Sequence, residues 1–314
     1  MEQDRRNFMK MALLGLALPG LLAAEKSVES ITAREFSKLP YYQYDNISHS
    51  NIKWQPVAEG LEFARVDVFK GKELVDVIAA LRINPEKNTV RVFNSFGYDR
   101  TIARTIEEWQ RVTGATAMIN SAQYMSDPYY MPCALVICDG KQKGPKTNKA
   151  VKGMLVAEPS VDSLPKIDLL DFDYDHFDHN NTPYTQGVQH WPILLDREGR
   201  IKVAKTTWQA NRTVVAKDWN KNMLFLTTEG GYFTLYNLGR FLQDSNRRLD
   251  KGLNVHTAMN MDGGYEADMI IKSSKLSYLT YGEFETYGLG RDASVFGWKI
   301  KIPGVIGVFP RKNS

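Results

Sequence analysis

Three polar residues, Asn120, Glu229 and Asp262, stand where apolar, strand-like runs of the sequence end. Side chains at strand ends are held by the scaffold and are often the ones that contact a ligand. The carboxylates of Glu229 and Asp262 are suited to activating a water molecule or attacking an electrophilic carbon. A Gly-Gly pair follows each carboxylate and lets the backbone turn sharply beside a bound group. Any one of these features is typical of an ordinary turn, but their repetition predicts one shared pocket.

Arg212 precedes a further apolar run and is a candidate anion-binding residue of the same pocket. A guanidinium group binds two phosphate oxygens as a bidentate pair and stabilises negative charge on them. The alternative role for this arginine is a structural salt bridge on a strand.

Six stretches of the chain, spread over residues 54–302, resemble the phosphodiester glycosidase family and occur in the family's order. Asn-Arg-Thr at residues 211–213 and Asn-Met-Asp-Gly-Gly at residues 260–264 are the most specific of them. The stretches are Gly114-Ala-Thr-Ala-Met-Ile-Asn120, Ala134-Leu-Val-Ile-Cys-Asp-Gly140, Gln189-His-Trp-Pro-Ile-Leu-Leu195, Asn211-Arg-Thr-Val-Val215, Leu226-Thr-Thr-Glu-Gly230 and Ala258-Met-Asn-Met-Asp-Gly-Gly264.

This resemblance implies the roles of individual residues. Asp262, Glu229, Arg212 and Asn120 match catalytic positions. The matching substrate-binding positions are Gln189, Thr213, Asn260, Gly263 and Gly264, and no metal ligand is implied.

The resemblance also implies the reaction, hydrolysis of a sugar-1-phosphodiester at the anomeric carbon. The departing phosphate monoester has a second pKa near 6, so it leaves without strong assistance from a general acid. Arg212 would hold the phosphate, and either Asp262 or Glu229 would activate water or attack the carbon. Asn120 would orient sugar hydroxyls or the water, and the backbone N–H groups near Gly263 would bind the anion.

Two stretches depart from the family pattern and place the substrate in question. Family members commonly have serine or glycine directly after the Asp-Gly-Gly turn, whereas this chain has Tyr265, Glu266 and Ala267. The loop after Asn120 usually carries phenylalanine, and here it reads Ser121-Ala-Gln-Tyr-Met125.

An acidic run, Asp171-Phe-Asp-Tyr-Asp-His-Phe-Asp-His179, lies outside the resemblance. If the run is extended, Asp171, Asp173 and Asp175 share one face and could collect a hard divalent cation such as calcium. The spacing matches no defined calcium loop, so a solvated acidic loop without a cofactor is the favoured interpretation. His176 and His179 are a weak indication of a transition metal.

The elements that must position these residues are mainly strands. Runs rich in Val and Ile predict strands at 61–69, 75–83, 89–93, 115–119, 213–216, 223–228 and 255–261. Helical spacing of apolar residues before Gly114 predicts a helix over 101–113, and Thr234 is expected to cap a second helix. We therefore expect an α+β fold, with a single domain of mixed β-sheet and a few packed helices.

The N-terminus predicts export. Arg5-Arg6, with Phe8 and Lys10 behind them, resembles a twin-arginine signal, and the apolar run that follows is too short for a stable membrane anchor. An ordinary secretory signal is the alternative. We expect a signal peptide at 1–24, a leader segment at 25–53, the domain at 54–302 and a C-terminal tail at 303–314. The mature protein is expected in the periplasm or outside the cell, with the twin-arginine machinery as a partner.

Composition limits the other partners. The formal net charge of the 314 residues is only +4, so there is no argument for a nucleic-acid or membrane-surface partner. Cys133 and Cys138 are five positions apart on an apparent strand and would be roughly 16 Å apart, out of disulfide reach. We expect buried thiols, although an oxidising compartment and a bent segment would favour a bridge.

The leading hypothesis is an exported hydrolase of phosphate-linked sugars in envelope or extracellular glycans. The alternative is a noncatalytic carbohydrate-binding or exopolysaccharide-assembly accessory protein of the same fold. Retention of Asp262 and Arg212 favours the enzyme, and the altered residues 265–267 favour the accessory protein. A metal-dependent esterase that uses the acidic run is a third hypothesis and requires a bound metal.

Overall fold

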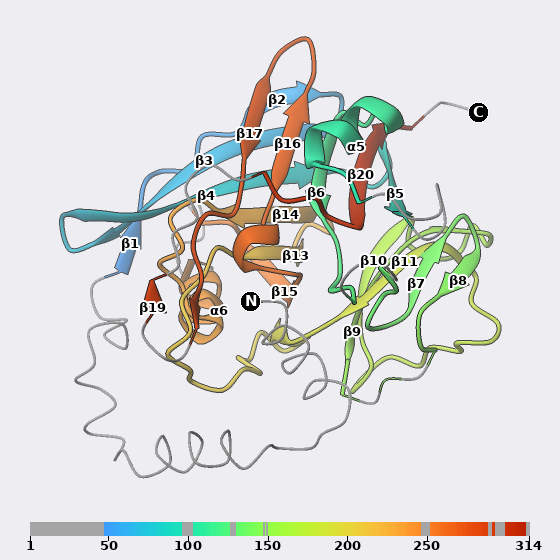
Figure 1. The fold of residues 1–314 in the computed structure, drawn as a ribbon. Helices are drawn as coiled ribbons and strands as arrows, with labels where there is room; N and C mark the ends of the chain where they lie inside the picture. The colour runs from blue at the N-terminus through green and yellow to red at the C-terminus, as the bar shows by residue number, and fades with distance from the viewer. Residues whose placement is uncertain are drawn as a thin grey trace.

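The computed structural model describes residues 47–95, 103–125, 130–146, 148, 150–245, 252–287, 291–292 and 299–311, and these form three main β-sheets with two α-helices (Figure 1). The signal peptide predicted at 1–24 and most of the predicted leader lie outside these residues. The end of the leader forms β1 (Ile47–His49), which pairs with β3 (Leu61–Lys70) at the edge of the largest sheet.

The largest sheet has the strand order β1-β3-β4-β14-β13-β15-β12, with β2 (Gln55–Ala58) added on β3. Its other strands are β4 (Glu73–Ile83), β12 (Ile193–Leu195), β13 (Thr213–Asp218), β14 (Met223–Thr228) and β15 (Val255–Asn260). The strands predicted at 61–69, 75–83, 213–216, 223–228 and 255–261 are thus confirmed. These strands carry apolar side chains on both faces, since Phe225 enters one core cluster and its neighbours Leu224 and Leu226 enter another. Both faces of the sheet are therefore covered.

One face of the large sheet is covered by α6 (Leu235–Ser245). The Oγ1 atom of Thr234 accepts a hydrogen bond from the N–H of Asn237 at 3.1 Å, which confirms Thr234 as the N-cap of the predicted helix. Leu238, Phe241 and Leu242 are buried against the sheet, as expected from their spacing along one side of a helix.

The opposite face packs against two five-stranded sheets. The first has the order β10-β9-β11-β7-β8, with β7 (Val136–Cys138), β8 (Lys141–Lys143), β9 (Gly153–Pro159), β10 (Ile167–Asp171) and β11 (Tyr184–His190). Cys133 and Cys138 are free thiols; Cys133 is buried but precedes β7, and Cys138 ends β7 and is half-buried, so the expectation of two buried thiols on one strand holds only in part. Burial raises the pKa of each thiol to about 12, so neither is a ready nucleophile.

The second of these sheets has the order β17-β16-β6-β20-β5 and corrects one predicted boundary. Its strands are β5 (Asn88–Asn94), β6 (Ala117–Asn120), β16 (Met269–Lys272), β17 (Ser277–Thr280) and β20 (Gly304–Pro310). Residues 303–314 were expected to be a tail, but β20 lies between β5 and β6, with Val305, Ile306 and Val308 fully buried. This apolar run could not remain exposed without a large loss of hydrophobic burial.

The helix α5 (Ile106–Thr113) covers this sheet beside β6, β16 and β20 (Figure 1). It begins at Ile106 because Thr105 and Glu108 form a reciprocal capping box. It ends at Gly114, whose φ of 70° is accessible to glycine at little cost. The predicted helix is therefore confirmed over residues 106–113. The prediction is wrong for residues 103–105, where Arg104 forms an isolated antiparallel bridge with Ile302, and residues 101–102 lie outside the described structure.

The fold class agrees with the prediction in its few helices, but strands dominate and the sheets are antiparallel. Every pairing between described strands is antiparallel, including the short pair β18 (Thr286–Tyr287) and β19 (Arg291–Asp292). Fewer than half of these pairings join consecutive strands, as β3 with β4 and β13 with β14 do, and the others join strands that are farther apart in the sequence. Within the described ranges, no helix is long and apolar enough to cross a membrane.

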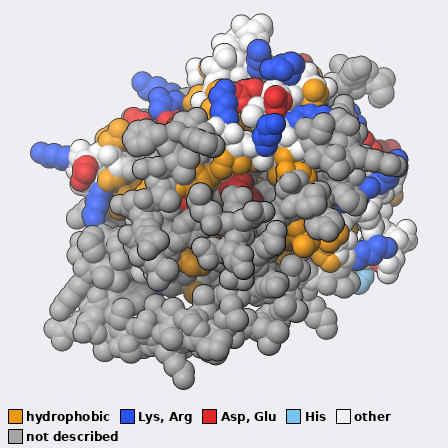
Figure 2. Space-filling model, in the orientation of Figure 1, with side chains coloured by type: hydrophobic (Ala, Val, Ile, Leu, Met, Phe, Trp, Pro, Cys, Tyr) orange, Lys and Arg blue, Asp and Glu red, His pale blue; other side chains and the backbone are white. Residues whose placement is uncertain are grey.

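One core cluster contains side chains from all three main sheets, for example Phe225, Leu155 and Ile306. The sheets therefore meet at a shared interior, and the ends of β6, β13 and β15 lie at its margin. On the face drawn in Figure 2, Lys and Arg side chains gather around the upper margin, and a patch of acidic atoms lies recessed near the centre among apolar side chains.

Candidate active site

Asn120 joins the strand ends that form the candidate site. Its side chain is 1% exposed and makes three hydrogen bonds. The Nδ2 atom donates to the backbone oxygen of Asp262 at 2.7 Å. The Oδ1 atom accepts from the hydroxyl of Thr213 at 2.6 Å and from the N–H of Asp268 at 3.2 Å. Asn120 therefore fixes β6 to the start of β13 and to both ends of the turn that follows β15.

Asp262 stands two residues beyond β15 and lines a small pocket. Its N–H donates to the oxygen of Ser121 at 3.2 Å, and its Oδ1 atom accepts from the N–H of Gly263 at 3.1 Å. These bonds orient both the backbone and the carboxylate of Asp262. The pocket is lined by Asn120, Ser121, Ala122, Asp262, Glu266, Ile302, Pro303 and Gly304.

Two of the four predicted catalytic residues, Asn120 and Asp262, thus line the same pocket. The structure adds Glu266, which follows the Gly-Gly pair on the short 3-10 helix η2 (Gly264–Glu266). Its only signal in the sequence was its place in a stretch that departs from the family pattern. We call Asn120, Asp262, Glu266 and Asp268 the pocket cluster.

Asp268 is a buried carboxyl group next to the pocket, and the sequence analysis did not identify it. Its side chain is 1% exposed, and its Oδ1 atom accepts from the N–H of Gly282 at 3.3 Å. Among the described residues, its buried Oδ2 atom has no hydrogen-bond partner. Burial raises the pKa of Asp268 well above its usual value, and the nearby charge of Glu266 adds to this effect.

Arg212 lies against the Gly-Gly turn but outside the lining of the pocket. Its Nη2 atom donates to the oxygen of Trp208 at 2.7 Å and its Nε atom to the oxygen of Phe233 at 3.3 Å. A Cβ atom on Gly263 would lie 3.6 Å from Nη1 of Arg212, so this turn and the guanidinium group are neighbours. Burial lowers the pKa of Arg212 to about 10, against the opposing charge of Glu285, so Arg212 remains a cation at neutral pH.

Glu229 lies at the same end of the large sheet but faces other partners. Its carboxylate forms a bidentate pair with Arg65, with contacts of 3.1 Å to Nε and 2.8 Å to Nη2. The hydroxyl of Tyr278 donates to the same carboxylate at 2.5 Å. Glu229 is absent from the pocket lining. Of the four residues expected to share one pocket, the structure therefore brings Asn120 and Asp262 together, with Arg212 adjacent.

The residues expected to bind substrate are mostly engaged within the protein. Thr213 is fully buried against Asn120. Gln189 is 1% exposed, and it accepts from the N–H of Leu135 at 3.2 Å and donates to the oxygen of Val151 at 2.9 Å. It therefore connects strands of the first five-stranded sheet.

The N–H groups of the Gly-Gly turn are also hydrogen-bonded within the protein. The N–H of Gly263 donates to Asp262, and that of Gly264 donates to the oxygen of Asn211 at 2.8 Å. In this structure these groups do not form the anion-binding nest considered from the sequence. Gly264 has a φ of 68°, which favours glycine there and reverses the chain into η2.

Asn260 and His190 form a buried pair behind the site. The Nδ1 atom of His190 contacts the oxygen of Asn260 at 2.9 Å, and Nδ2 of Asn260 donates to the oxygen of Trp191 at 3.3 Å. Burial lowers the pKa of His190 to about 4, so this ring is neutral at pH 7.

The acidic run adopts a turn, and the extended arrangement considered from the sequence is wrong for Asp171, Asp173 and Asp175. The N–H of Asp173 donates to the carboxylate of Asp171, and the N–H of Asp171 donates to Asp175. Because these hydrogen bonds fold the segment on itself, the three carboxylates do not line one face of a strand. Among the described residues, no group of three His, Cys, Asp or Glu side chains is placed to hold a metal ion.

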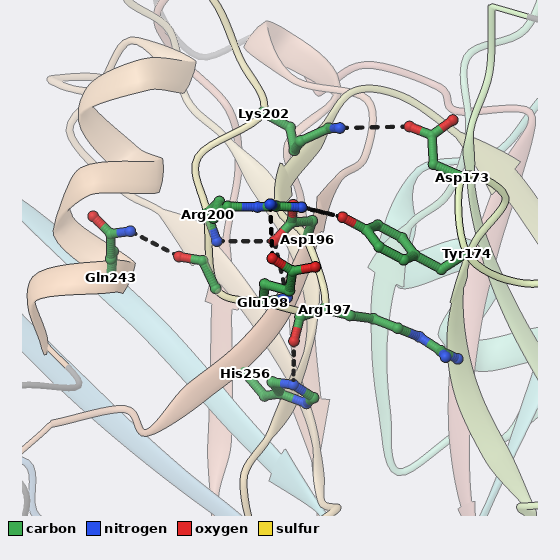
Figure 3. Close-up of polar contacts among 10 residues, drawn as sticks. Asp173, Tyr174, Asp196, Arg197, Glu198, Arg200, Lys202, Gln243 and His256 are labelled. Carbon is green, nitrogen blue, oxygen red and sulfur yellow. Dashed lines mark hydrogen bonds and ion pairs between the residues drawn. The ribbon is translucent and has the colours of Figure 1, made fainter.

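The carboxylates of this run pair with cations (Figure 3). Asp173 contacts Lys202 at 3.5 Å, as Figure 3 shows. Asp173 also contacts Lys152 at 3.2 Å, and Asp175 pairs with Arg197. The contacts continue into the hairpin after β12, where the fully buried carboxylate of Asp196 accepts from Nε of Arg200 at 2.9 Å. We call the contacts among Asp173, Tyr174, Asp175, Asp196, Arg197, Arg200 and Lys202 the hairpin network.

Comparison with known proteins identifies the family. The model of the phosphodiester glycosidase family matches residues 113–309, more than half of the chain. A comparison with curated protein sequences gives no significant match.

Solved structures share the fold. The catalytic domain of zebrafish N-acetylglucosamine-1-phosphodiester alpha-N-acetylglucosaminidase, auto-inhibited by its pro-peptide, superposes with a TM-score of 0.56 at 14% identity, covering 85% of this chain and 89% of that domain. A hypothetical protein from Synechocystis superposes with a TM-score of 0.51 at 12% identity, covering 83% of this chain and 64% of that protein.

Proposed function

This chain belongs to the phosphodiester glycosidase family, and from that premise we propose that it is an exported hydrolase of sugar-1-phosphodiesters in envelope or extracellular glycans. The observation that carries the proposal is Asp262, which lines the pocket; its backbone oxygen accepts a hydrogen bond from Asn120, and its carboxylate accepts one from the N–H of Gly263. The substrate is a phosphate-linked sugar or polysaccharide, whose anomeric carbon would be placed against this carboxylate.

Charge supports this assignment. The carbon that breaks its bond to phosphate acquires positive charge in the transition state, and an ionised Asp262 stabilises that charge. Arg212 remains a cation beside the Gly-Gly turn and supplies the positive charge that the departing phosphate needs. Arg212 would reach the phosphate by a change of side-chain rotamer or through Nη1, because its Nε and Nη2 atoms are bonded to backbone oxygens.

A second function, a noncatalytic carbohydrate-binding or polysaccharide-assembly accessory protein, is favoured by one observation. Glu229, a predicted catalytic carboxylate, is paired with Arg65 and Tyr278. A site with a single working carboxylate would bind a glycan without turning it over.

An activity panel separates these functions. Purified mature protein is incubated with sugar-1-phosphodiesters that differ in sugar and stereochemistry, with and without chelator, and release of the phosphate monoester is measured. Hydrolysis that is insensitive to chelator supports the proposal. Saturable binding of these compounds without hydrolysis supports the accessory function, and activity lost with chelator supports a metal-dependent esterase.

Export has its own test. Replacing Arg5 and Arg6 together by lysine is expected to leave uncleaved precursor in the cytoplasm, because the twin-arginine route requires its arginine pair. Fractionation followed by immunoblotting measures this. Undiminished export of the Lys-Lys variant would assign the protein to another secretory route.

A further inference from the structure

Asp76 is a buried carboxyl group that the proposed reaction does not use. It lies on β4 and is 3% exposed. Its Oδ1 atom accepts hydrogen bonds from the N–H groups of Gly230 at 2.6 Å and Val77 at 2.7 Å, and its Oδ2 atom accepts one from the N–H of Tyr232 at 2.9 Å. A Cβ atom on Gly230 would lie only 3.0 Å from Oδ1, so glycine suits this close approach. The carboxyl group of Asp76 therefore fixes the turn that follows β14.

This turn, residues 229–233, contacts the segment that carries Arg212. The backbone oxygen of Phe233 accepts from Nε of Arg212 at 3.3 Å, and the oxygen of Tyr232 accepts from Nε2 of Gln209 at 2.8 Å. Just before the turn, Oγ1 of Thr228 accepts from the N–H of Arg212 at 2.9 Å. Both ends of the turn are thus hydrogen-bonded to residues 209–212, so a displacement of the turn would displace the guanidinium group.

The Nη1 atom of Arg212 lies beside the Gly-Gly turn at 263–264. It is 3.6 Å from the position that a Cβ atom on Gly263 would take. The other two guanidinium nitrogens are bonded to backbone oxygens, Nε to Phe233 and Nη2 to Trp208 at 2.7 Å. A guanidinium group held in this way loses less side-chain entropy when it binds an oxyanion. The position of turn 229–233 therefore determines how well Arg212 is oriented for a phosphate group.

The charge of Asp76 depends on pH near neutrality. Burial raises its pKa to about 6 and outweighs the three N–H groups, which lower it, and the charge of Glu229 adds to the rise. Tyr232 also faces Asp76 from the turn, and the charge of Glu73 on β4 acts on the same tyrosine. The partner of Asp76 on β3 is the apolar Val68. A proton on Oδ2 meets one N–H donor, whereas on Oδ1 it would meet two, so protonation weakens the bond to Tyr232.

We propose that Asp76 is a positioning residue for Arg212 and controls the binding of the substrate phosphate through turn 229–233. The inference rests on the proposed hydrolysis of a sugar-1-phosphodiester, in which Arg212 binds the phosphate. The ionised carboxylate of Asp76 fixes the turn, and the turn orients the guanidinium group through the oxygen of Phe233. Asp76 itself does not touch the substrate. Protonation or removal of its carboxylate loosens the turn and weakens phosphate binding, while Asp262 keeps its own hydrogen bonds.

The test measures KM and kcat of Asp76→Asn in the mature protein, on the best substrate of the wild type. At pH 8 the variant is expected to raise KM at least about tenfold, because a small misplacement of a binding group has a large effect. The change in kcat is expected to be smaller, because the carboxylate of Asp262 is held by a different turn. A phosphodiester keeps one negative charge between pH 5 and 8, so its own titration does not alter KM. The KM of the wild type should therefore rise as pH falls below about 6, and that of Asp76→Asn should change much less.

Two further variants separate positioning from other effects. Arg212→Lys replaces the planar guanidinium group that the oxygen of Phe233 orients, so Asp76→Asn should raise KM much less in this background. Glu73→Gln is the matched control on the same strand. It removes an exposed charge close to Tyr232 and is expected to keep the KM and kcat of the wild type.

Melting temperatures verify that each variant is folded. A wild-type KM in folded Asp76→Asn overturns the inference and leaves the proposed function intact. An equal rise of KM in the Arg212→Lys background also overturns it, because Asp76 would then act by another route. If Asp76→Asn does not fold, the wild type alone decides, since a KM that stays constant from pH 8 to pH 5 overturns the inference. A wild type that hydrolyses no member of the panel overturns both proposals.

Discussion

Acidic side chains gather in two regions of this molecule, and the two regions accommodate negative charge in opposite ways. In the hairpin network the carboxylates face cations, as where Asp196 meets Arg200 and Asp173 meets Lys202 (Figure 3). In the pocket cluster, Asp262 and Asp268 accept backbone N–H groups at 3.1 and 3.3 Å. The first arrangement neutralises charge within the protein. The second hydrogen-bonds these two carboxylates to backbone N–H groups.

The pKa values follow this division. Burial alone would raise the pKa of Asp196, but hydrogen bonds from Arg200 and Glu198 outweigh it and hold that pKa below the usual value. For Asp268, burial dominates and the pKa rises well above the usual value. Density of acidic residues in the sequence is therefore a poor guide to chemistry, because the partners that decide the pKa come from distant segments.

The prediction with the largest expected effect tests the pocket cluster and concerns activity. Asp262→Asn is expected to lower kcat by about a hundredfold or more, equivalent to about 3 kcal/mol of barrier, because it removes negative charge from the pocket. Its melting temperature should hardly change, since the backbone of Asp262 carries the bonds to Asn120 and Ser121. Steady-state kinetics and thermal melts measure the two quantities.

Arg212→Lys sharpens the same test. Lysine keeps the positive charge but loses the fork that binds phosphate in a bidentate pair, so an intermediate rate is expected. Full activity in a stable Asp262→Asn protein would contradict the assignment of chemistry to the pocket cluster.

The strand ends that carry the pocket cluster could be predicted from the sequence, because the end of an apolar run indicates where a strand ends. Asn120 and Asp262 each follow an apolar run, and both line the pocket. The pairing of Glu229 with Arg65 could not be predicted from the sequence. The two residues are 164 positions apart, and nothing in the sequence around either one indicates the other as its partner. The pocket position of Glu266 depends on the direction that the chain takes after Gly264, which residue type alone does not specify.

Much of the fold was predictable for a similar reason. Alternating or continuous apolar runs identified most strands of the large sheet, and Thr234 and Gly114 identified one end of each helix. The strand β20 was missed because it is near the end of the chain, although its buried Val305, Ile306 and Val308 carry the same apolar signal. Sheet order could not be predicted, because β20 pairs with strands that lie 185 to 222 positions earlier, from Val305 with Asn120 to Pro310 with Asn88.

In the hairpin network, the second expected effect is on stability and not on activity. Asp196→Ala removes a fully buried carboxylate that accepts from the backbone of Glu198 and Arg200 and from the guanidinium group of Arg200. The free energy of unfolding is expected to fall by about 1 to 3 kcal/mol, because these donors lose a buried acceptor. Urea unfolding measures the loss. A kcat far below that of the wild type at a temperature where the variant is folded would contradict a purely structural role.

The third effect is a dependence of stability on pH that has opposite signs in the two regions. Asp268 has a folded pKa above its unfolded value of 3.8, so the folded state binds more protons between these values. Its contribution to the free energy of unfolding therefore falls by about 1.4 kcal/mol per pH unit as pH rises from 4 toward the folded pKa. Asp268→Asn lacks this titration. The free energy of unfolding of the wild type minus that of the variant should therefore fall as pH rises over that range.

Asp196→Asn is the control for that experiment. The folded pKa of Asp196 is lowered, so its contribution is fully present above pH 3.8 and is lost as pH falls through the folded pKa. Urea unfolding between pH 3 and 8 measures both differences. Curves for Asp268→Asn and wild type that run parallel between pH 4 and 8 would show that Asp268 is ionised in the folded protein and that the two regions do not differ.

The smallest effect is expected at Asp173, one of the three acidic residues that the sequence analysis considered as cation ligands. Its carboxylate is 39% exposed and pairs with Lys152 and Lys202, and Lys152 foremost holds its pKa below the usual value. Exposed pairs of this kind contribute about 0.5 kcal/mol or less, because water screens both charges and the side chains lose entropy on pairing. Asp173→Asn should therefore change the free energy of unfolding by no more than about that amount, with kcat unchanged.

Lys152→Met is the matched control that removes the other partner of this ion pair. The double variant should lose no more free energy of unfolding than either single variant. Added calcium should leave the melting temperature of wild type and Asp173→Asn equally unaffected. A calcium-dependent rise in the wild type alone would instead assign this run to cation binding, and chemistry would then no longer be confined to the pocket cluster.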